Sequence, residues 1–159
     1  MNQVAELLPA ANILLDVDAG TKARLFDAVG ALVEKSSGLA RSVVVDSLAA
    51  RERLGSTGLG QGVAIPHGRI KGLREAQGAF VRLRAPIPFD APDGKPVAQV
   101  FVLLVPEQAT ERHLQLLSEL AQMFSDKAFR DRLATASSPA ALRALFDGWA
   151  ATASRVRDE

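Results

Sequence analysis

The run Val97-Ala98-Gln99-Val100-Phe101-Val102-Leu103-Leu104-Val105 is almost wholly apolar and rich in β-branched residues. A strand with one face in water alternates polar and apolar side chains, whereas a continuous apolar run is typical of a strand that is covered on both faces. We therefore expect this run to be the central strand of a sheet that carries helices on both sides.

Outward from this run, short apolar segments alternate with longer amphipathic ones. The short segments predict strands at residues 13–15, 63–65 and 79–83. Apolar residues at helical spacing predict helices at residues 21–35, 41–54 and 111–124, and Ser138-Pro139 opens a last helix. This alternation indicates an α/β fold, a single domain whose mixed β-sheet is sandwiched between helices, and it leaves the strand order open. We place the domain at residues 1–150 and expect residues 151–159 to be a frayed polar tail.

The composition agrees with one globular domain and excludes several functions. Of the 159 residues, 48% are hydrophobic and 23% are charged, which is ordinary globular usage. The 19 Lys and Arg residues nearly balance the 18 Asp and Glu residues, for a net charge of +1, so we expect no nucleic acid and no anionic membrane as the main partner. The absence of Cys excludes disulfides, thiolate metal sites and thiol catalysis.

The apolar runs are all far shorter than the ~18 residues that a membrane-spanning helix needs, so we expect no membrane insertion. The first nine residues contain Glu6 and no basic residue ahead of their apolar segment, which is not the charge pattern of a secretory signal. A cytoplasmic location is the expectation that follows.

The segment from Gly55 to Gly62 holds four of the 12 glycines and resembles a nucleotide-binding loop at first sight. A phosphate-binding loop needs Lys and then Ser or Thr where the chain has Gln61 and Gly62. A dinucleotide fingerprint needs a third Gly where the chain has Val63. The spacing therefore argues against nucleotide binding.

The chain has two histidines, and the setting of His67 favours chemistry. An isolated His is more often a structural residue than a catalytic one. Here Pro66 ends a predicted strand, and Gly68 allows a sharp turn after the ring, so a rigid strand end would present the imidazole with free backbone N–H groups nearby. A neutral imidazole is nucleophilic near pH 7, and its phosphorylated form is reactive enough to pass the group on.

Two further side chains are candidates for binding an anion. His113 lies about three residues inside a helix that Thr110 is placed to cap, near free N–H groups and the positive end of the helix dipole. Its bland alternative is a His that packs beside Leu116. Arg51 lies at the end of the helix that precedes the glycines, where it could bind phosphate oxygens or simply be a favourable cation at a helix C-terminus.

One continuous segment carries a family resemblance: Arg51-Glu52-Arg53-Leu54-Gly55-Ser56-Thr57-Gly58-Leu59-Gly60-Gln61-Gly62-Val63-Ala64-Ile65-Pro66-His67-Gly68. It resembles the active-site signature of the mannitol/fructose-type enzyme IIA proteins of the bacterial phosphoenolpyruvate-dependent phosphotransferase system. Phe89-Asp90-Ala91, Leu103-Leu104-Val105-Pro106 and Arg112-His113-Leu114 also follow the family pattern. Arg69 and the single domain make the chain most similar to the nitrogen-related branch.

The resemblance implies an enzyme IIA fold and a role for each candidate residue. His67 would take a phosphoryl group from a small histidine phosphocarrier protein, His113 would be the second active-site histidine, and Arg51 would support the phosphoryl site. No cofactor or metal is implied. A donor must reach His67, so we expect an exposed apolar patch around it, with Leu59 and Ile70 as candidate contacts; the alternative is that both are core residues.

Three functions remain open. A nitrogen-related protein would regulate partners such as potassium transport proteins or sensor kinases according to its phosphorylation state. A sugar-specific enzyme IIA would pass the group to a fructose or mannitol permease component. An unrelated two-histidine phosphoesterase would hydrolyse its substrate, but the His-x-Thr pairs of such enzymes are missing at His67 and His113. The sequence leaves the oligomeric state open.

Overall fold

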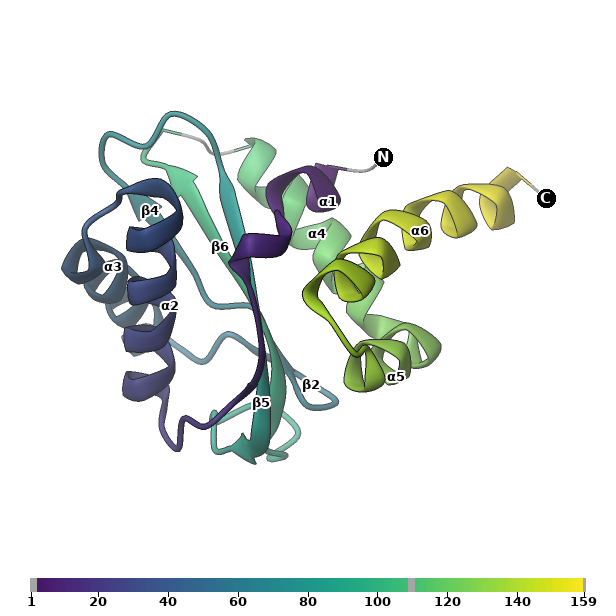
Figure 1. Cartoon of the computed structure of the whole chain (residues 1–159), viewed down its shortest axis with the longest axis horizontal. Coiled ribbons are helices and arrows are strands. Elements are labelled where there is room, and N and C mark those ends of the chain that lie inside the picture. Colours follow the sequence, from purple (N-terminus) through teal and green to yellow (C-terminus); the bar gives the residue numbers. More distant parts are fainter. Residues whose placement is uncertain (1–2, 109–110, 159) are drawn as a thin grey trace.

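A six-stranded mixed sheet lies between two layers of helices in the computed structural model, which describes residues 3–108 and 111–158 (Figure 1). The strands are β1 (Ile13–Val17), β2 (Gly58–Gly60), β3 (Val63–Ala64), β4 (His67–Ile70), β5 (Gln77–Ile87) and β6 (Val97–Pro106). The helices are α1 (Gln3–Leu7), α2 (Lys22–Ser37), α3 (Arg41–Arg53), α4 (Glu111–Ser125), α5 (Lys127–Thr135) and α6 (Pro139–Asp158), with a short 3-10 helix at Ala10–Asn12. The predicted α/β sandwich is confirmed.

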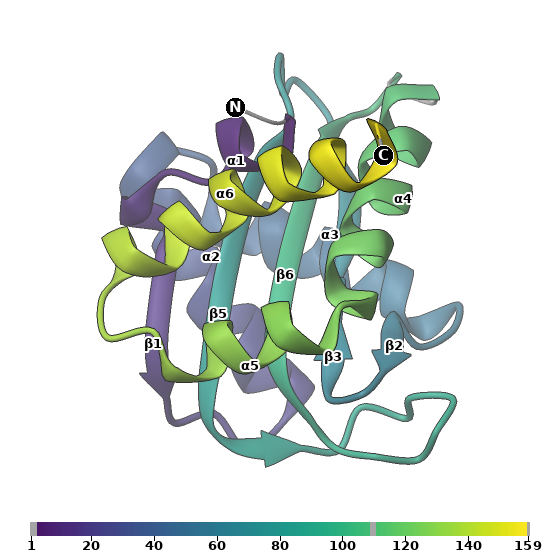
Figure 2. The same cartoon turned by 90° about the vertical axis from the view of Figure 1, so that its right-hand side faces the viewer.

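Strand β6 is the centre of the sheet, as its apolar run predicts. It pairs antiparallel with β5 on one side and parallel with β3 and β4 on the other. Alternate side chains of β6 point into two separate cores: Phe101, Leu103 and Val105 pack under α1, α4, α5 and α6, whereas Val100, Val102 and Leu104 pack under α2 and α3. Figures 1 and 2 show these two helical layers on opposite faces of the sheet.

Local signals account for the ends of several helices. The side-chain oxygen of Thr21 accepts a hydrogen bond from the Arg24 amide, and Gly38 ends α2 in the left-handed conformation with a φ of 80°. The side chain of Asp126 caps α5 in the same way, although the sequence reading did not predict that helix or α1. The predicted cap of α4, Thr110, lies outside the described residues. Helix α6 continues to Asp158, so the residues expected to form a frayed tail are helical to that point.

Strands β3 and β4 are two parts of one interrupted strand beside β6. Val63 pairs with Gln99 and His67 pairs with Leu103, which is the same register on both sides of the interruption. Within the gap, the carbonyl of Pro66 accepts a hydrogen bond from the Leu103 amide at 3.0 Å. The predicted strand end at Pro66 is therefore only a break, and His67 begins a new strand within the sheet.

The role expected for Gly68 is wrong. The chain does not turn at this residue, which lies inside β4, and its φ is not positive. Instead, a Cβ at this position would collide with the hydroxyl of Ser47 and lie 3.3 Å from the Ser47 carbonyl carbon. Gly68 is needed because α3 packs directly on the backbone of β4.

The substitution Gly68→Ala should therefore destabilise the fold by about 1–3 kcal/mol, the usual cost of overpacking a tight contact. Gly20→Ala is the matched control, because a Cβ at Gly20 meets no atom within 4 Å. Urea unfolding of both variants measures the effect. Equal stability of the two variants would contradict the packing explanation.

None of the helices in the described part of the chain is long and apolar enough to cross a bilayer.

Candidate active site

The three candidate residues come from three different elements and meet at one cavity of about 670 Å³. Arg51 lies in the last turn of α3, His67 is the first residue of β4, and His113 lies in the first turn of α4. The structure thus brings together side chains that are up to 62 positions apart, from 51 to 113. Six other residues line the same cavity: Asp46, Ser47, Ala50, Leu54, Gly68 and Arg69.

A backbone carbonyl fixes the protonation of the His67 ring. Nδ1 lies 2.8 Å from the carbonyl oxygen of Ile65. A carbonyl only accepts hydrogen bonds, so Nδ1 must carry the proton and Nε2 must keep its lone pair. The break between β3 and β4 allows this contact, because it turns the Ile65 carbonyl toward a side chain two residues later. No pattern in the sequence points to this carbonyl.

The Arg51 guanidinium joins the ring of His67 to the end of α3. Its Nε donates to Nε2 of His67 at 3.3 Å, and its Nη1 donates to the carbonyl oxygen of Gly55 at 2.9 Å. The second contact holds the side chain in place across the helix end. The nucleophilic nitrogen of His67 therefore lies directly beside a fixed positive charge that has further N–H groups to offer.

The second histidine lies edge-on to the first. The ring centroids of His67 and His113 are 5.3 Å apart and the ring planes are at 80°. His113 is only 8% exposed, and its Nε2 has no hydrogen-bond partner among the described residues. A buried ring nitrogen without a partner is rare in proteins, and a group that enters the cavity could supply that partner.

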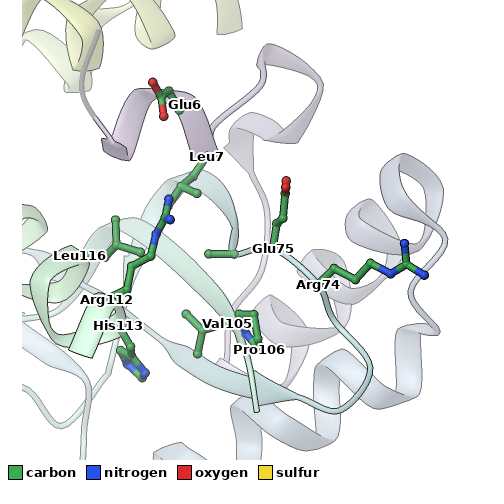
Figure 3. A pocket seen from close by; sticks show the side chains of 10 residues that line it. Glu6, Leu7, Arg74, Glu75, Val105, Pro106, Arg112, His113 and Leu116 are labelled. Carbon is green, nitrogen blue, oxygen red and sulfur yellow. The ribbon is translucent and has the colours of Figure 1, made fainter. Parts of the chain in front are cut away.

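A second cavity, of about 460 Å³, lies on the other side of His113, between α1, the start of β5 and the start of α4. Figure 3 shows Arg112 beside Leu7 in this cavity, while the ring of His113 turns away from Arg112. His113 lines both cavities.

Burial and positive charge lower the pKa of both rings. For His67 the main cause is burial, and the charge of Arg51 adds to it, whereas the Ile65 carbonyl and Glu52 oppose the shift. For His113 the causes are burial and then the positive charges of His67, Arg69 and Arg51. Both imidazoles are therefore neutral at pH 7, the state in which His67 can act as a nucleophile.

This lowered pKa makes a prediction about pH. The unfolded reference value is 6.5, so as the pH falls the unfolded chain binds protons before the folded protein does. The free energy of unfolding should therefore decrease below pH 6.5, until the pH reaches the folded pKa values. Thermal melts from pH 7.5 to 5 measure this slope. A ¹⁵N titration of the rings gives the folded pKa values directly, and a value above 6.5 for His67 would contradict the burial argument.

The glycine-rich segment lies apart from the cavity at His67. Among the described residues that line the His67 cavity, none belongs to residues 55–62. The segment instead forms β2 and the turn into β3, where Gln61 has a φ of 58° and its amide donates to the carboxylate of Asp93 at 2.8 Å. Its backbone N–H groups are therefore not part of the phosphoryl site as the structure stands.

The apolar surface near His67 also differs from expectation. Ile70 is 1% exposed and belongs to the core, so it cannot contact a partner. Leu59 is 44% exposed but lines a separate cavity with Ala121 and Phe124. The exposed apolar side chains of the site are instead Leu54, 85% exposed on the cavity wall, and Leu114, 68% exposed and next to His113.

Comparison with known proteins shows the family of the chain. Residues 6–148 match the family model described as "Phosphoenolpyruvate-dependent sugar phosphotransferase system, EIIA 2". The chain belongs to this EIIA family. It is therefore a phosphoryl-transfer component of the phosphotransferase system, and the two-histidine phosphoesterase is not supported.

Individual relatives place this EIIA chain near the nitrogen-related branch, as the sequence predicts. It is 42% identical over 143 residues to a nitrogen regulatory protein of Pseudomonas aeruginosa, covering 89% of this chain and 93% of that protein. The crystal structure of the nitrogen regulatory protein IIA-Ntr from Neisseria meningitidis matches with a TM-score of 0.86 and 54% identity, over 91% of this chain and 99% of that one. The mannitol IIA protein of Escherichia coli shares the fold, with a TM-score of 0.73 and 24% identity over 86% and 96% of the two chains.

Proposed function

We propose that this EIIA protein accepts a phosphoryl group on Nε2 of His67 from the phosphohistidine of a small carrier protein. The observation that carries the proposal is the fixed tautomer of His67. Since the Ile65 carbonyl holds the proton on Nδ1, Nε2 keeps its lone pair, which accepts the Arg51 Nε–H at 3.3 Å until the phosphoryl group takes its place. His67 and Arg51 both line the open cavity.

The transfer needs no acid, base or metal from this chain. The lone pair of Nε2 attacks phosphorus while the phosphorus–nitrogen bond to the donor ring breaks. The donor ring keeps the bonding electrons and, because it carries a proton on its other nitrogen, leaves as a neutral imidazole. The His67 ring keeps its proton on Nδ1, hydrogen-bonded to the Ile65 carbonyl, and takes over the positive charge of the phosphorylated ring. Because one imidazole replaces another, the reaction is close to thermoneutral and reversible, as a carrier requires.

Positive charge and N–H donors stabilise the moving group. As the phosphoryl group reaches Nε2, the Nε–H of Arg51 loses its acceptor there and is free to bond a phosphoryl oxygen. Arg69, whose side chain donates to the Glu107 carbonyl, adds a second guanidinium at the cavity wall. His113 offers the buried Nε2 that lacks a partner. Two guanidinium groups and one imidazole are therefore available to stabilise the negative charge on the phosphoryl oxygens in the transition state.

The donor docks on the exposed apolar residues that flank the cavity. Leu54, directly after α3, lines the cavity, and Leu114 follows His113 on α4; both are exposed and would be buried by a partner that brings its own histidine to Nε2. This replaces the contacts that the sequence suggested at Leu59 and Ile70.

The regulatory reading of the activity is the one the relatives support. The more similar relatives carry the name nitrogen regulatory protein, so we propose a cytoplasmic phosphoprotein whose phosphorylation state controls binding to regulatory targets such as potassium transport proteins or sensor kinases. The alternative is transfer to a sugar permease component. Adding permease components and fructose or mannitol to the phosphorylated protein distinguishes the two, because only the sugar-specific function yields sugar phosphate.

The proposal is tested by determining which ring nitrogen receives the phosphoryl group. We expect the protein, incubated with phosphoenolpyruvate and the upstream carrier proteins, to gain one acid-labile phosphoryl group. The ¹⁵N spectrum of the ring should show the group on Nε2, with the proton still on Nδ1. The phosphorylated protein should be long-lived and should not release inorganic phosphate at the turnover rate of a phosphoesterase. Phosphorylation on Nδ1, or rapid release of phosphate, would contradict the assignment.

A further inference from the structure

A buried carboxylate lies next to the active-site arginine and does not line the cavity. The Glu52 side chain is only 7% exposed, and its nearest partners are strong ones. It accepts a hydrogen bond from the Thr57 hydroxyl at 2.6 Å, the Thr57 amide lies 3.2 Å from its Oε2, and Lys22 Nζ lies 2.8 Å from the same oxygen. A buried carboxylate costs free energy even when it is paired, so its presence calls for a reason beyond stability.

Lys22, the cation of this pair, makes two further contacts. The ammonium group of Lys22 lies 4.7 Å from the centre of the Phe89 ring and 3.5 Å from the carboxylate of Asp90. Lys22 is the first residue of α2, so the contact with Glu52 joins α2 to the end of α3. The carboxylate is therefore fixed by two elements rather than by its own helix alone.

The hydrogen bonds of Glu52 lead to both members of the active pair. On one side, the contact between Glu52 and Thr57 closes the turn that contains Gly55, whose amide also donates to the Glu52 carbonyl at 3.2 Å. The Gly55 carbonyl in turn accepts from the Arg51 guanidinium, which reaches Nε2 of His67. On the other side, the carbonyl of Thr57 accepts from the Ile65 amide at 3.0 Å, and the Ile65 carbonyl binds Nδ1 of His67. A shift of Thr57 would therefore move the support of both the guanidinium and the imidazole.

We propose that Glu52 is a positioning residue for phosphoryl transfer, which clamps Thr57 and Lys22 so that Arg51 stays on Nε2 of His67. This proposal rests on the proposed function and adds Glu52, with its partners Thr57 and Lys22, to the residues that support the transfer. The clamp takes no part in bond making, and its effect appears only through the placement of Arg51 and His67. Misplacement of reacting groups by about 1 Å can cost on the order of 100-fold in rate, so even a partial loss is measurable.

The negative charge of Glu52 has a second effect, which is on the pKa of His67. The carboxylate of Glu52 raises the pKa of His67 against the lowering by burial and Arg51. Glu52→Gln should therefore shift the pKa of His67 further down through the lost charge, whereas Thr57→Val keeps the charge and lacks this cause of a shift.

The experiment compares Thr57→Val, Thr57→Ser and Glu52→Gln with Asp131→Asn as the control. The control breaks the Lys127–Asp131 pair, whose side chains are 78% and 63% exposed on α5. Single-turnover transfer from phosphorylated carrier protein is measured at saturating and limiting donor, together with melting temperature. ¹⁵N spectra record the Arg51 Nε–H signal and the His67 ring nitrogens in each unphosphorylated variant.

We expect Thr57→Val and Glu52→Gln to slow transfer about tenfold or more at saturating donor, with the half-saturating donor concentration unchanged and the Arg51 Nε–H signal broadened. Thr57→Ser keeps the hydroxyl and should transfer at nearly the wild-type rate, as should Asp131→Asn.

Wild-type transfer rates and an unchanged Arg51 signal in folded Thr57→Val would overturn the proposal, even if the melting temperature falls. If Glu52→Gln does not fold, Thr57→Val decides alone. If the wild-type protein accepts no phosphoryl group, the proposed function fails, and the Arg51 and His67 spectra still decide the positioning claim.

Discussion

The His67→Gln protein should take up no acid-labile phosphoryl group from the phosphorylated donor. Glutamine has a similar size and can still bond the Ile65 carbonyl, but it has no lone pair that can attack phosphorus. Mass spectrometry at neutral pH, before and after mild acid, measures the incorporation. Loss should be complete, because the chain has no Cys and its second histidine, His113, is buried.

His113→Gln is the matched control for this experiment. Its ring lies 5.3 Å from that of His67, so it shares the site, but its Nε2 is buried and out of reach of a docking donor. We expect His113→Gln to accept the group on His67 more slowly than the wild type. Labelling of His67→Gln on His113 would show that the two rings had been assigned the wrong roles.

The largest rate effect without loss of the nucleophile is expected for Arg51→Ala. Removal of one preorganised donor to a developing negative charge typically costs about 100- to 1000-fold in rate, and Arg51 also supplies the fixed positive charge beside Nε2. Donor binding should change little, because the apolar docking residues remain. Rapid-quench kinetics over a range of donor concentrations separates the two effects.

Arg53→Ala is the control for the loss of a positive charge at the same helix end. It lies in the last turn of α3 like Arg51, but it does not line the cavity. An equal loss of rate in both variants would indicate a general effect of charge on donor attraction. The Arg51→Ala protein should also show a higher His67 pKa, because the guanidinium lowers it.

The sequence predicted the parts of the fold that depend on hydrophobic pattern. The apolar run at 97–105 gave the central strand, and the spacing of Leu25, Val29 and Val33 gave α2 and its buried face. Helix α5 was missed because its nine residues carry only two buried side chains, Phe129 and Leu133, which is too short a pattern to recognise. Strand β4 was missed because His67 and Arg69 interrupt its apolar pattern.

The members of the site could be found from the sequence, but their geometry could not. A signature identifies Arg51 and His67, since both lie in one continuous segment, and His113 follows from the same resemblance. The bond between Nδ1 and the Ile65 carbonyl depends on the break between β3 and β4, which only the pairing with β6 reveals. The buried state of Glu52 depends on Lys22, 30 positions earlier in the chain, and no local pattern connects the two.

The anchoring of β4 has a consequence for how other proteins would distinguish the two forms. Four residue pairs join β4 to β6, and the ring of its first residue is tethered through Nδ1, so the backbone has little reason to rearrange when the group arrives. The two forms should superimpose, and the difference between them is an electric field, because a group with about two negative charges replaces the positive potential at the cavity mouth. A partner protein that recognises this difference in charge should distinguish the phosphorylated from the unphosphorylated form less well as the ionic strength rises.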